Sequence, residues 1–118
     1  MSDETRWWHR AACRGVDPDI RRHFHTTAEG EGDPGWYAPA YAVCGRCPVA
    51  DECLEDGLSE RWHVWGGLAV GQRRRVIWLR RRGRWVEADE AVAEFRRRNA
   101  RLARRGWRPR RRGEAVVA

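Results

Sequence analysis

The sequence predicts a mainly α-helical protein, a small helical domain wrapped around four cysteines and followed by a basic C-terminal helix and tail. Three observations lead to this prediction. Apolar residues recur at helical spacings of three and four over residues 85–102. Alternating runs of β-branched residues, which would indicate strands, are absent from the sequence. A chain of 118 residues has room for one domain and a tail, and so small a core often depends on a bound metal or on disulfides.

Three helices are expected before the C-terminal one. Residues 39–43 should form a short helix that leads into the second cysteine. A helix is expected over residues 48–60, because its first position is a proline, which lacks the N–H group that a first turn leaves unpaired. Residues 72–82 should form a third helix that Gly83 ends.

The clearest helical pattern lies over residues 85–102. Acidic residues in its first turns and arginines in its last turns complement the helix dipole, and Glu94 can pair with Arg98. The stripe must pack on the domain, on a second copy or on a partner, and Asn99 is the kind of residue that fixes register in a coiled coil. The stripe positions are Trp85, Ala88, Val92, Phe95, Asn99 and Leu102.

Charge divides the chain unevenly. Residues 1–72 carry 7 Arg against 12 acidic residues, a net charge of −5, whereas residues 73–118 carry 17 Arg against 5 acidic residues, a net charge of +12. This asymmetry predicts an acidic N-terminal module and a nucleic-acid-seeking C-terminal part. The expected domain boundary lies at Gly83, with the cysteine-bearing domain over residues 1–82 and the arginine-rich amphipathic helix and basic tail over residues 83–118.

The N-terminal residues contain no apolar stretch typical of a signal peptide, and no later run reaches membrane-spanning length. We therefore expect a cytoplasmic protein without a membrane partner. In a reducing compartment, four cysteines are more often metal ligands or catalytic thiols than permanent disulfides.

The cysteines are spaced as Cys44-x2-Cys47-x5-Cys53, with Cys13 thirty residues upstream of the run. A structural zinc site often uses two close pairs, and Cys13 has no close partner in the sequence. A thioredoxin-like pair at Cys44 and Cys47 would require a βαβ pattern that is not visible. A 4Fe-4S cluster often takes three thiolates from one stretch and a fourth from elsewhere, so the spacing favours a cluster while zinc stays possible.

Four ordered motifs resemble the WhiB-like family of actinobacterial and phage regulators: residues 12–18, residues 44–54, residues 64–68 and the arginine-rich segment after them. The resemblance spans residues 7–82. It implies a 4Fe-4S cluster that is sensitive to nitric oxide and oxygen, and a turn that meets region 4 of the primary sigma factor of RNA polymerase. The implied ligands are Cys13, Cys44, Cys47 and Cys53, and the implied sigma contacts are Trp65, Gly66 and Gly67.

The chain departs from the family pattern at two places. The family usually has two aromatic residues near the cluster after its Asp-Pro step, and this chain has Phe24 alone. His63 stands where a glycine usually precedes the Trp65 turn. The remaining aromatics, Trp7, Trp8, Trp36 and Trp62, are interpreted as core or interface residues that shield a cluster, and His9, His23, His25 and His63 as surface or outer-shell residues.

Clusters of arginine in the C-terminal part could neutralise DNA phosphates and release their counterions. Residues 105–110 loosely resemble an AT-hook that Trp107 interrupts. The candidate DNA-binding residues are Arg80, Arg81, Arg82, Arg108, Arg110, Arg111 and Arg112.

No catalytic triad, paired-carboxylate pocket or phosphate-binding loop is visible, so we do not expect an enzyme. The predicted function is redox- or nitric-oxide-responsive regulation of transcription through the sigma factor and promoter DNA. Two alternatives stay open: an apo-form thiol-disulfide oxidoreductase that uses Cys44 and Cys47, and a DNA-binding module stabilised by zinc. The sequence leaves the oligomeric state open.

Overall fold

The computed structural model describes residues 6–25, 27–33 and 35–108. Two short 3-10 turns, Trp7–Arg10 and Arg22–Phe24, accompany the α-helices. Within these residues no strand forms, and the one β-type pairing joins Trp65 to Leu68. The prediction of a mainly helical protein is therefore confirmed. The helices are α1 Pro18–Arg21, α2 Ala38–Cys44, α3 Ala50–Gly57, α4 Val70–Arg81 and α5 Trp85–Arg105.

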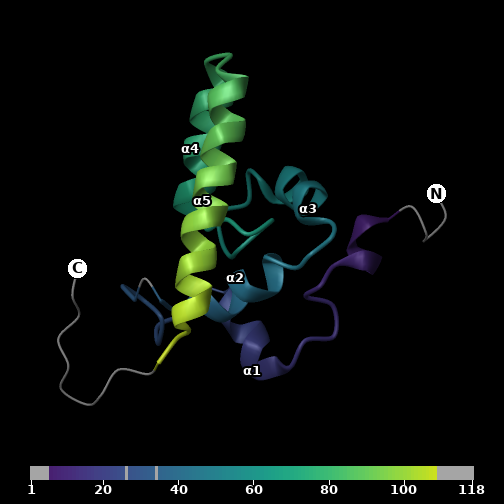
Figure 1. Ribbon diagram of the computed structural model, residues 1–118, viewed down its shortest axis with the longest axis vertical. Helices are drawn as coiled ribbons and strands as arrows, with labels where there is room; N and C mark the ends of the chain where they lie inside the picture. Colours follow the sequence, from purple (N-terminus) through teal and green to yellow (C-terminus); the bar gives the residue numbers. More distant parts are fainter. Residues whose placement is uncertain (1–5, 26, 34, 109–118) are drawn as a thin grey trace.

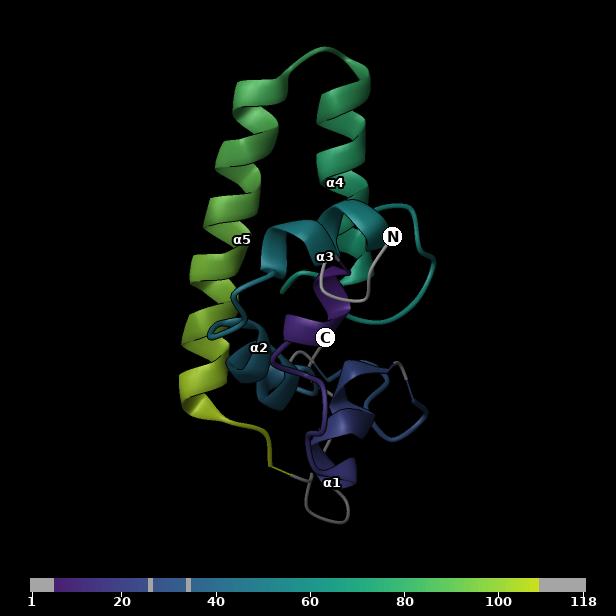
Figure 2. The same cartoon turned by 90° about the vertical axis from the view of Figure 1, so that its right-hand side faces the viewer.

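Helices α4 and α5 form an antiparallel hairpin whose closed end projects beyond the rest of the molecule (Figures 1 and 2). Gly83 makes the turn between them with φ of 72°, a conformation that glycine adopts without steric cost. The predicted helix over 72–82 and its end at Gly83 are confirmed to within two residues. No described helix is both long and apolar enough to cross a membrane.

Helix α5 folds back along the domain and contributes to both parts of its core. At its N-terminal half, Ala88 and Val92 pack with residues of α3, α4 and the loop between them. At its C-terminal half, Leu102 packs against the cluster formed by Ala40, Tyr41 and Val64. The sequence left three possible surfaces for the amphipathic stripe: the domain itself, a second copy or a partner. The stripe packs on the domain. Asn99 is buried inside this chain and does not face a coiled-coil partner.

Several details of the helices differ from the sequence prediction. Helix α3 begins at Ala50, because Val49 has φ of −119° and ψ of 27° and Pro48 lies in the turn before it. The helix ends at Gly57, where an added Cβ would lie 2.1 Å from the Trp65 ring. Trp85 is 55% exposed rather than part of the buried stripe.

The remaining differences concern short-range polar contacts. Glu94 pairs with Arg97 at 2.7 Å rather than with Arg98. Helix α1 was not predicted. It forms because the Asp17 carboxylate accepts a hydrogen bond from the Asp19 backbone N–H at 2.8 Å, which caps its first turn.

Candidate metal centre

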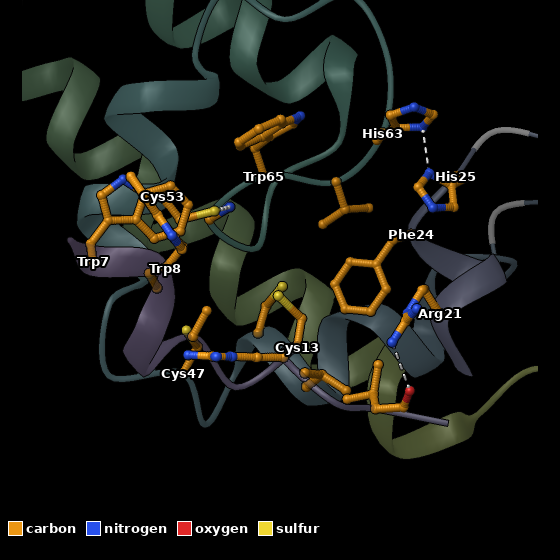
Figure 3. Close-up of a pocket in the computed structure, with 18 of the residues that line it drawn as sticks. Trp7, Trp8, Cys13, Arg21, Phe24, His25, Cys47, Cys53, His63 and Trp65 are labelled. Carbon is orange, nitrogen blue, oxygen red and sulfur yellow. Dashed lines mark hydrogen bonds between the residues drawn. The ribbon is translucent and has the colours of Figure 1, made fainter. Parts of the chain in front are cut away.

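The four cysteines line one cavity of about 580 Å³. They come from three segments: Cys13 from the loop before α1, Cys44 from the end of α2, and Cys47 and Cys53 from the loop before α3 and the middle of that helix. Figure 3 shows Cys13, Cys47 and Cys53 around this cavity, with Trp65 on one side. The fold thus gathers all four predicted ligands, including the one that is remote in sequence.

The thiols are close enough to influence one another. Burial, together with a smaller contribution from the neighbouring Cys53, raises the pKa of Cys44 to about 12. Burial is also the main cause of the raised pKa values of Cys13 and Cys53, with Cys47 adding to both. Taken together, these interactions connect every pair of the four cysteines. Without a bound cation the site therefore favours neutral thiols, whereas metal ions would convert them to thiolates.

Backbone N–H groups point at three of the sulfur atoms. Such hydrogen bonds stabilise a negatively charged sulfur and orient it, which is the usual contribution of the residues around a metal ligand. The three donors and acceptors are the Ala12 N–H to Cys47 Sγ at 3.4 Å, the Gly66 N–H to Cys53 Sγ at 3.2 Å, and the Gly67 N–H to Cys44 Sγ.

Across residues 6–25, 27–33 and 35–108, no three His, Cys, Asp or Glu side chains converge on a point where they could hold one metal ion. A zinc ion requires its sulfur ligands at about 2.3 Å from a single centre. The four thiols line one cavity of about 580 Å³, which has room for a group larger than one ion. The donor set of four thiols is the one that a 4Fe-4S cluster takes.

Aromatic side chains form much of the cavity wall. Trp7, Trp8, Phe24 and Trp65 all line it, as expected for residues that keep water away from a cluster. The expectation fails for two of the tryptophans it covered, because neither lines the cavity: Trp62 is 60% exposed, and Trp36 is buried in the core.

The Trp65 turn closes one side of the cavity. Trp65 and Leu68 exchange two backbone hydrogen bonds of 3.0 Å, and between them Gly66 and Gly67 have φ of 59° and 83°. A Cβ on Gly66 would lie 2.5 Å from Leu54 Cβ, so glycine is required there on two counts. The sharp turn predicted for the two glycines is confirmed. Trp65 itself is half-buried at the cavity edge and lies against Gly57.

Arg73 holds the loop that carries this turn, a role that was not predicted from the sequence. Its side chain is fully buried at 0% exposure. Its position three residues before the buried Val76, on the same helical face, was the signal that could have revealed its role. The guanidinium donates to the carbonyl oxygens of Glu60, Trp62, His63 and Leu68 at 3.0, 3.0, 2.6 and 2.7 Å.

Three of the histidines line the cavity, namely His9, His25 and His63. The Nδ1 atoms of His25 and His63 are 3.0 Å apart and share a hydrogen bond (Figure 3). His63 has φ of 72°, so it keeps the left-handed backbone that the family's glycine would adopt. His23, interpreted from the sequence as a surface or outer-shell residue, is buried against Trp36 and does not line the cavity.

The candidate DNA-binding arginines have different surroundings. Arg80 makes two hydrogen bonds to the Glu55 carboxylate, at 2.8 and 2.5 Å, and is largely covered. Arg81, Arg82 and Arg108 are exposed, and the Arg82 guanidinium lies 3.8 Å from the centre of the Trp78 ring. Arg110, Arg111 and Arg112 lie outside the described residues.

Trp107, which interrupts the AT-hook-like segment, is docked on the domain. Its ring lies 4.9 Å from that of His23 and 5.1 Å from that of Trp36, and its Nε1 donates to Asp33 at 3.0 Å. Arg22 sits over both indole rings at 5.5 and 5.6 Å. This aromatic group therefore joins the end of α5 to the segments around His23 and Trp36.

Comparison with known proteins agrees with this geometry. The family described as Transcription factor WhiB matches residues 7–76. Transcriptional regulator WhiB1 of Mycobacterium tuberculosis is 35% identical over 88 residues, which are 73% of this chain and 98% of the relative. Transcriptional regulator WhiD of Streptomyces coelicolor is 40% identical over 90 residues, 74% of this chain and 78% of the relative. No solved structure matches the chain significantly.

Proposed function

Since this chain belongs to the WhiB family of transcription factors, we propose that it is a transcriptional regulator that carries a 4Fe-4S cluster and binds region 4 of the primary sigma factor and promoter DNA. One observation carries the cluster proposal: four thiols from three separate segments surround a single cavity with aromatic walls. We further propose that the regulator responds to nitric oxide or oxygen.

The proposed ligands are Cys13, Cys44, Cys47 and Cys53. Bound there, a 4Fe-4S cluster would supply a centre that reacts with nitric oxide and oxygen. The ligand residues would join the segments of the chain that carry them. Cys13 holds the N-terminal segment against α3, where the indole of Trp7 also donates a hydrogen bond to Asp56. The other three thiols join the end of α2 to α3.

Regulation by conditional assembly follows from this arrangement. While the four ligands are engaged, the N-terminal segment, α3 and the Trp65 turn keep their relative positions, and the surface offered to the sigma factor exists. When the ligands are released, the raised thiol pKa values leave neutral side chains with little attraction for one another. The N-terminal segment then detaches, and the surface changes.

The proposed sigma contact is the turn formed by Trp65, Gly66 and Gly67. A half-buried indole on a rigid turn is suited to anchor a protein interface, since it presents apolar area at little entropic cost. The proposed DNA contacts are the exposed Arg81, Arg82 and Arg108 together with the tail arginines. Arg80 would need to leave Glu55 before it could contact a phosphate.

The two alternatives find less support. An oxidoreductase needs a thiolate nucleophile with a lowered pKa, whereas the pKa of Cys44 is raised to about 12. A zinc site needs four ligands around one ion, and the described side chains are not arranged in that way.

The decisive experiment is the visible spectrum and the metal content of protein purified without oxygen. We expect a brown protein with about four irons per chain, and loss of colour and iron in each of the four Cys→Ser variants. Arg46→Ser, between Cys44 and Cys47, is the matched control and should keep its cluster. A colourless wild-type protein with one zinc per chain would refute the cluster.

Sigma binding is tested separately with cluster-loaded protein and isolated sigma region 4. Trp65→Ala should weaken the complex by at least about tenfold, as expected for loss of a central aromatic anchor. Trp85→Ala removes an exposed indole at the far end of the hairpin and should bind like wild type. Equal affinities for the two variants would show that Trp65 serves only the cavity wall.

A further inference from the structure

The peptide group that joins Gly66 to Gly67 connects the metal centre to α5. Its N–H, which belongs to Gly67, lies beside Cys44: a Cβ on Gly67 would be 3.6 Å from Cys44 Cβ, and this N–H lowers the pKa of the Cys44 thiol as a hydrogen-bond donor, against the larger effect of burial. Its carbonyl, which belongs to Gly66, accepts two hydrogen bonds from the guanidinium of Arg96, at 3.1 Å from Nε and 3.0 Å from Nη2. Because a peptide group is planar, fixing the carbonyl also fixes the direction of the N–H.

The next carbonyl along the turn is held in the same way. Asn99 is 2% exposed, and its Nδ2 donates to the Gly67 carbonyl at 2.7 Å. Asn99 also exchanges two hydrogen bonds with Gln72, at 2.9 and 3.1 Å, and Gln72 accepts from the backbone N–H of Ala69 at the start of α4. The buried amide therefore locks the turn, α4 and α5 together.

Arg96 and the next residue, Arg97, make different contacts. The third nitrogen of Arg96 is held by the Asp51 carboxylate at 2.6 Å, so its guanidinium is fixed between α3 and the turn. Arg97 bonds only to Glu94 on the same helix and is exposed. The two residues thus form a natural pair, one in contact with the turn and one free of it.

We propose that Arg96 and Asn99 are positioning residues of the metal centre, which hold the Gly66–Gly67 turn so that its N–H groups face Cys44 and Cys53. The proposal rests on the proposed cluster at the four cysteines. A positive charge bonded to the carbonyl polarises the peptide, which strengthens the N–H hydrogen bond to the sulfur. Hydrogen bonds to the ligand sulfurs and nearby positive charge both raise the reduction potential of an iron-sulfur cluster.

Arg96 and Asn99 lie beyond the residues that the family model matches. That match ends at residue 76, within α4, whereas Arg96 and Asn99 lie in α5. The C-terminal helix is joined to the proposed metal centre through the hydrogen bonds of these two side chains to the turn. A change at the sulfur atoms reaches α5 through one turn.

The test uses full-length protein loaded with its cluster without oxygen. Arg96→Gln removes the charge and the paired donors, and Arg97→Gln is the matched control. We measure the midpoint reduction potential and the rate at which visible absorbance is lost in air. Arg96→Gln should lose its cluster about 10- to 100-fold faster than the control and show a more negative potential. Arg96→Lys, which keeps the charge but not the paired donors, should lie between Arg96→Gln and wild type.

The possible outcomes distinguish a failure of this inference from a failure of the proposed function on which it rests. A wild-type protein without a cluster would refute the proposed function itself. A loaded wild type, with Arg96→Gln matching Arg97→Gln in potential and stability to air, would overturn the inference alone. A drop in the stability of the Arg96→Gln apo protein with no change in potential would also overturn it, because Arg96 would then serve only the fold. Asn99→Asp places an acceptor against the Gly67 carbonyl, so it should lower the potential and speed the loss of the cluster as Arg96→Gln does. If Asn99→Asp does not fold, the result for Arg96→Gln alone decides the test.

Discussion

At the scale of single residues, His63 illustrates how a local departure from a pattern is accommodated. It occupies a left-handed backbone conformation, with φ of 72°, immediately before the Trp65 turn. The hydrogen bond between its ring and the ring of His25 offsets part of the backbone strain. Residues other than glycine are strained in the left-handed conformation. The turn therefore keeps its shape at the cost of backbone strain at His63.

We therefore expect His63→Gly to raise the free energy of unfolding of the apo protein by about 1 kcal/mol, because glycine adopts positive φ without strain. Urea unfolding followed by circular dichroism measures the change. His25→Ala, which removes the ring hydrogen bond and leaves the backbone of residue 63 unchanged, is the control and should be neutral or slightly destabilising. The idea of backbone strain is wrong if His63→Gly is no more stable than His25→Ala.

Arg73 is a buried cation whose hydrogen bonds go to carbonyl oxygens of one loop. Replacing it by Met leaves several buried acceptors without donors, so we expect a loss of at least about 3 kcal/mol in the free energy of unfolding. Arg74→Met, at the exposed neighbouring position, should change it by less than about 0.5 kcal/mol.

Arg73→Lys gives a milder test, in case the Met variant does not fold. A lysine has one ammonium and cannot reach all four carbonyls, so its stability should fall between those of wild type and Arg73→Met. Thermal or urea unfolding of the three variants under one set of conditions decides. A similar stability for Arg73→Met and Arg74→Met would contradict the role assigned to Arg73.

The Cys44 thiol should react slowly in the apo protein, because only the thiolate is nucleophilic and burial raises the pKa of this thiol to about 12. Its alkylation rate should keep rising well above pH 9, whereas the rate for an ordinary thiol levels off above about pH 8.5. Peptide mapping after timed iodoacetamide treatment follows each cysteine separately. A rate at Cys44 that levels off near pH 9 would show that its thiol is not perturbed.

The four cysteines singled out from the sequence line one cavity, and they could be singled out because a thiol's chemistry and spacing are visible in the residue letters. Their role as metal ligands stays a prediction. Arg73, Arg96 and Asn99 were not assigned to the site. An arginine that binds carbonyl oxygens has the same letter as one that faces solvent, and what separates them is tertiary packing. The conformation of His63 likewise depends on the loop around it.

At the scale of secondary-structure elements, helices with strong apolar periodicity were predicted well. The helices now seen as α2, α4 and α5 have boundaries within about three residues of those expected. The start of α3 was placed too early because Pro48 is compatible both with a first helical turn and with the turn before it. Helix α1 and the 3-10 turns are too short to give a period and depend on caps and neighbours.

The end of α5 supplies a prediction at this scale. Trp107 packs on His23 and Trp36 just after the helix, so Trp107→Ala should lower the free energy of unfolding by about 1–3 kcal/mol, less than for a fully buried tryptophan. Trp85→Ala, at the exposed start of the same helix, should change it by no more than about 0.5 kcal/mol. Urea unfolding compares the two variants. Equal effects would mean that the aromatic docking contributes nothing to stability.

At the scale of the whole molecule, the charge division along the sequence is not a division in space. The acidic and basic parts meet in ion pairs, Arg80 with Glu55 and Arg96 with Asp51. Part of the positive charge of residues 73–118 is thus used within the fold, and the exposed arginines remain for a polyanion. Composition predicted an attraction to nucleic acid but could not show which arginines are already engaged. The proposed boundary between residues 82 and 83 stays a prediction.

The four proposed ligands differ in their exposure and in their separation along the sequence. Cys13 is the exposed one, and thirty residues separate it from Cys44, whereas the other three lie within one stretch of ten residues. Closing a longer loop costs more chain entropy, so we expect the proposed cluster to engage the three neighbouring thiols first and Cys13 last. We expect its loss to begin at Cys13, the exposed ligand. A centre built in this order would pass through a three-thiol stage both when it is made and when it is lost.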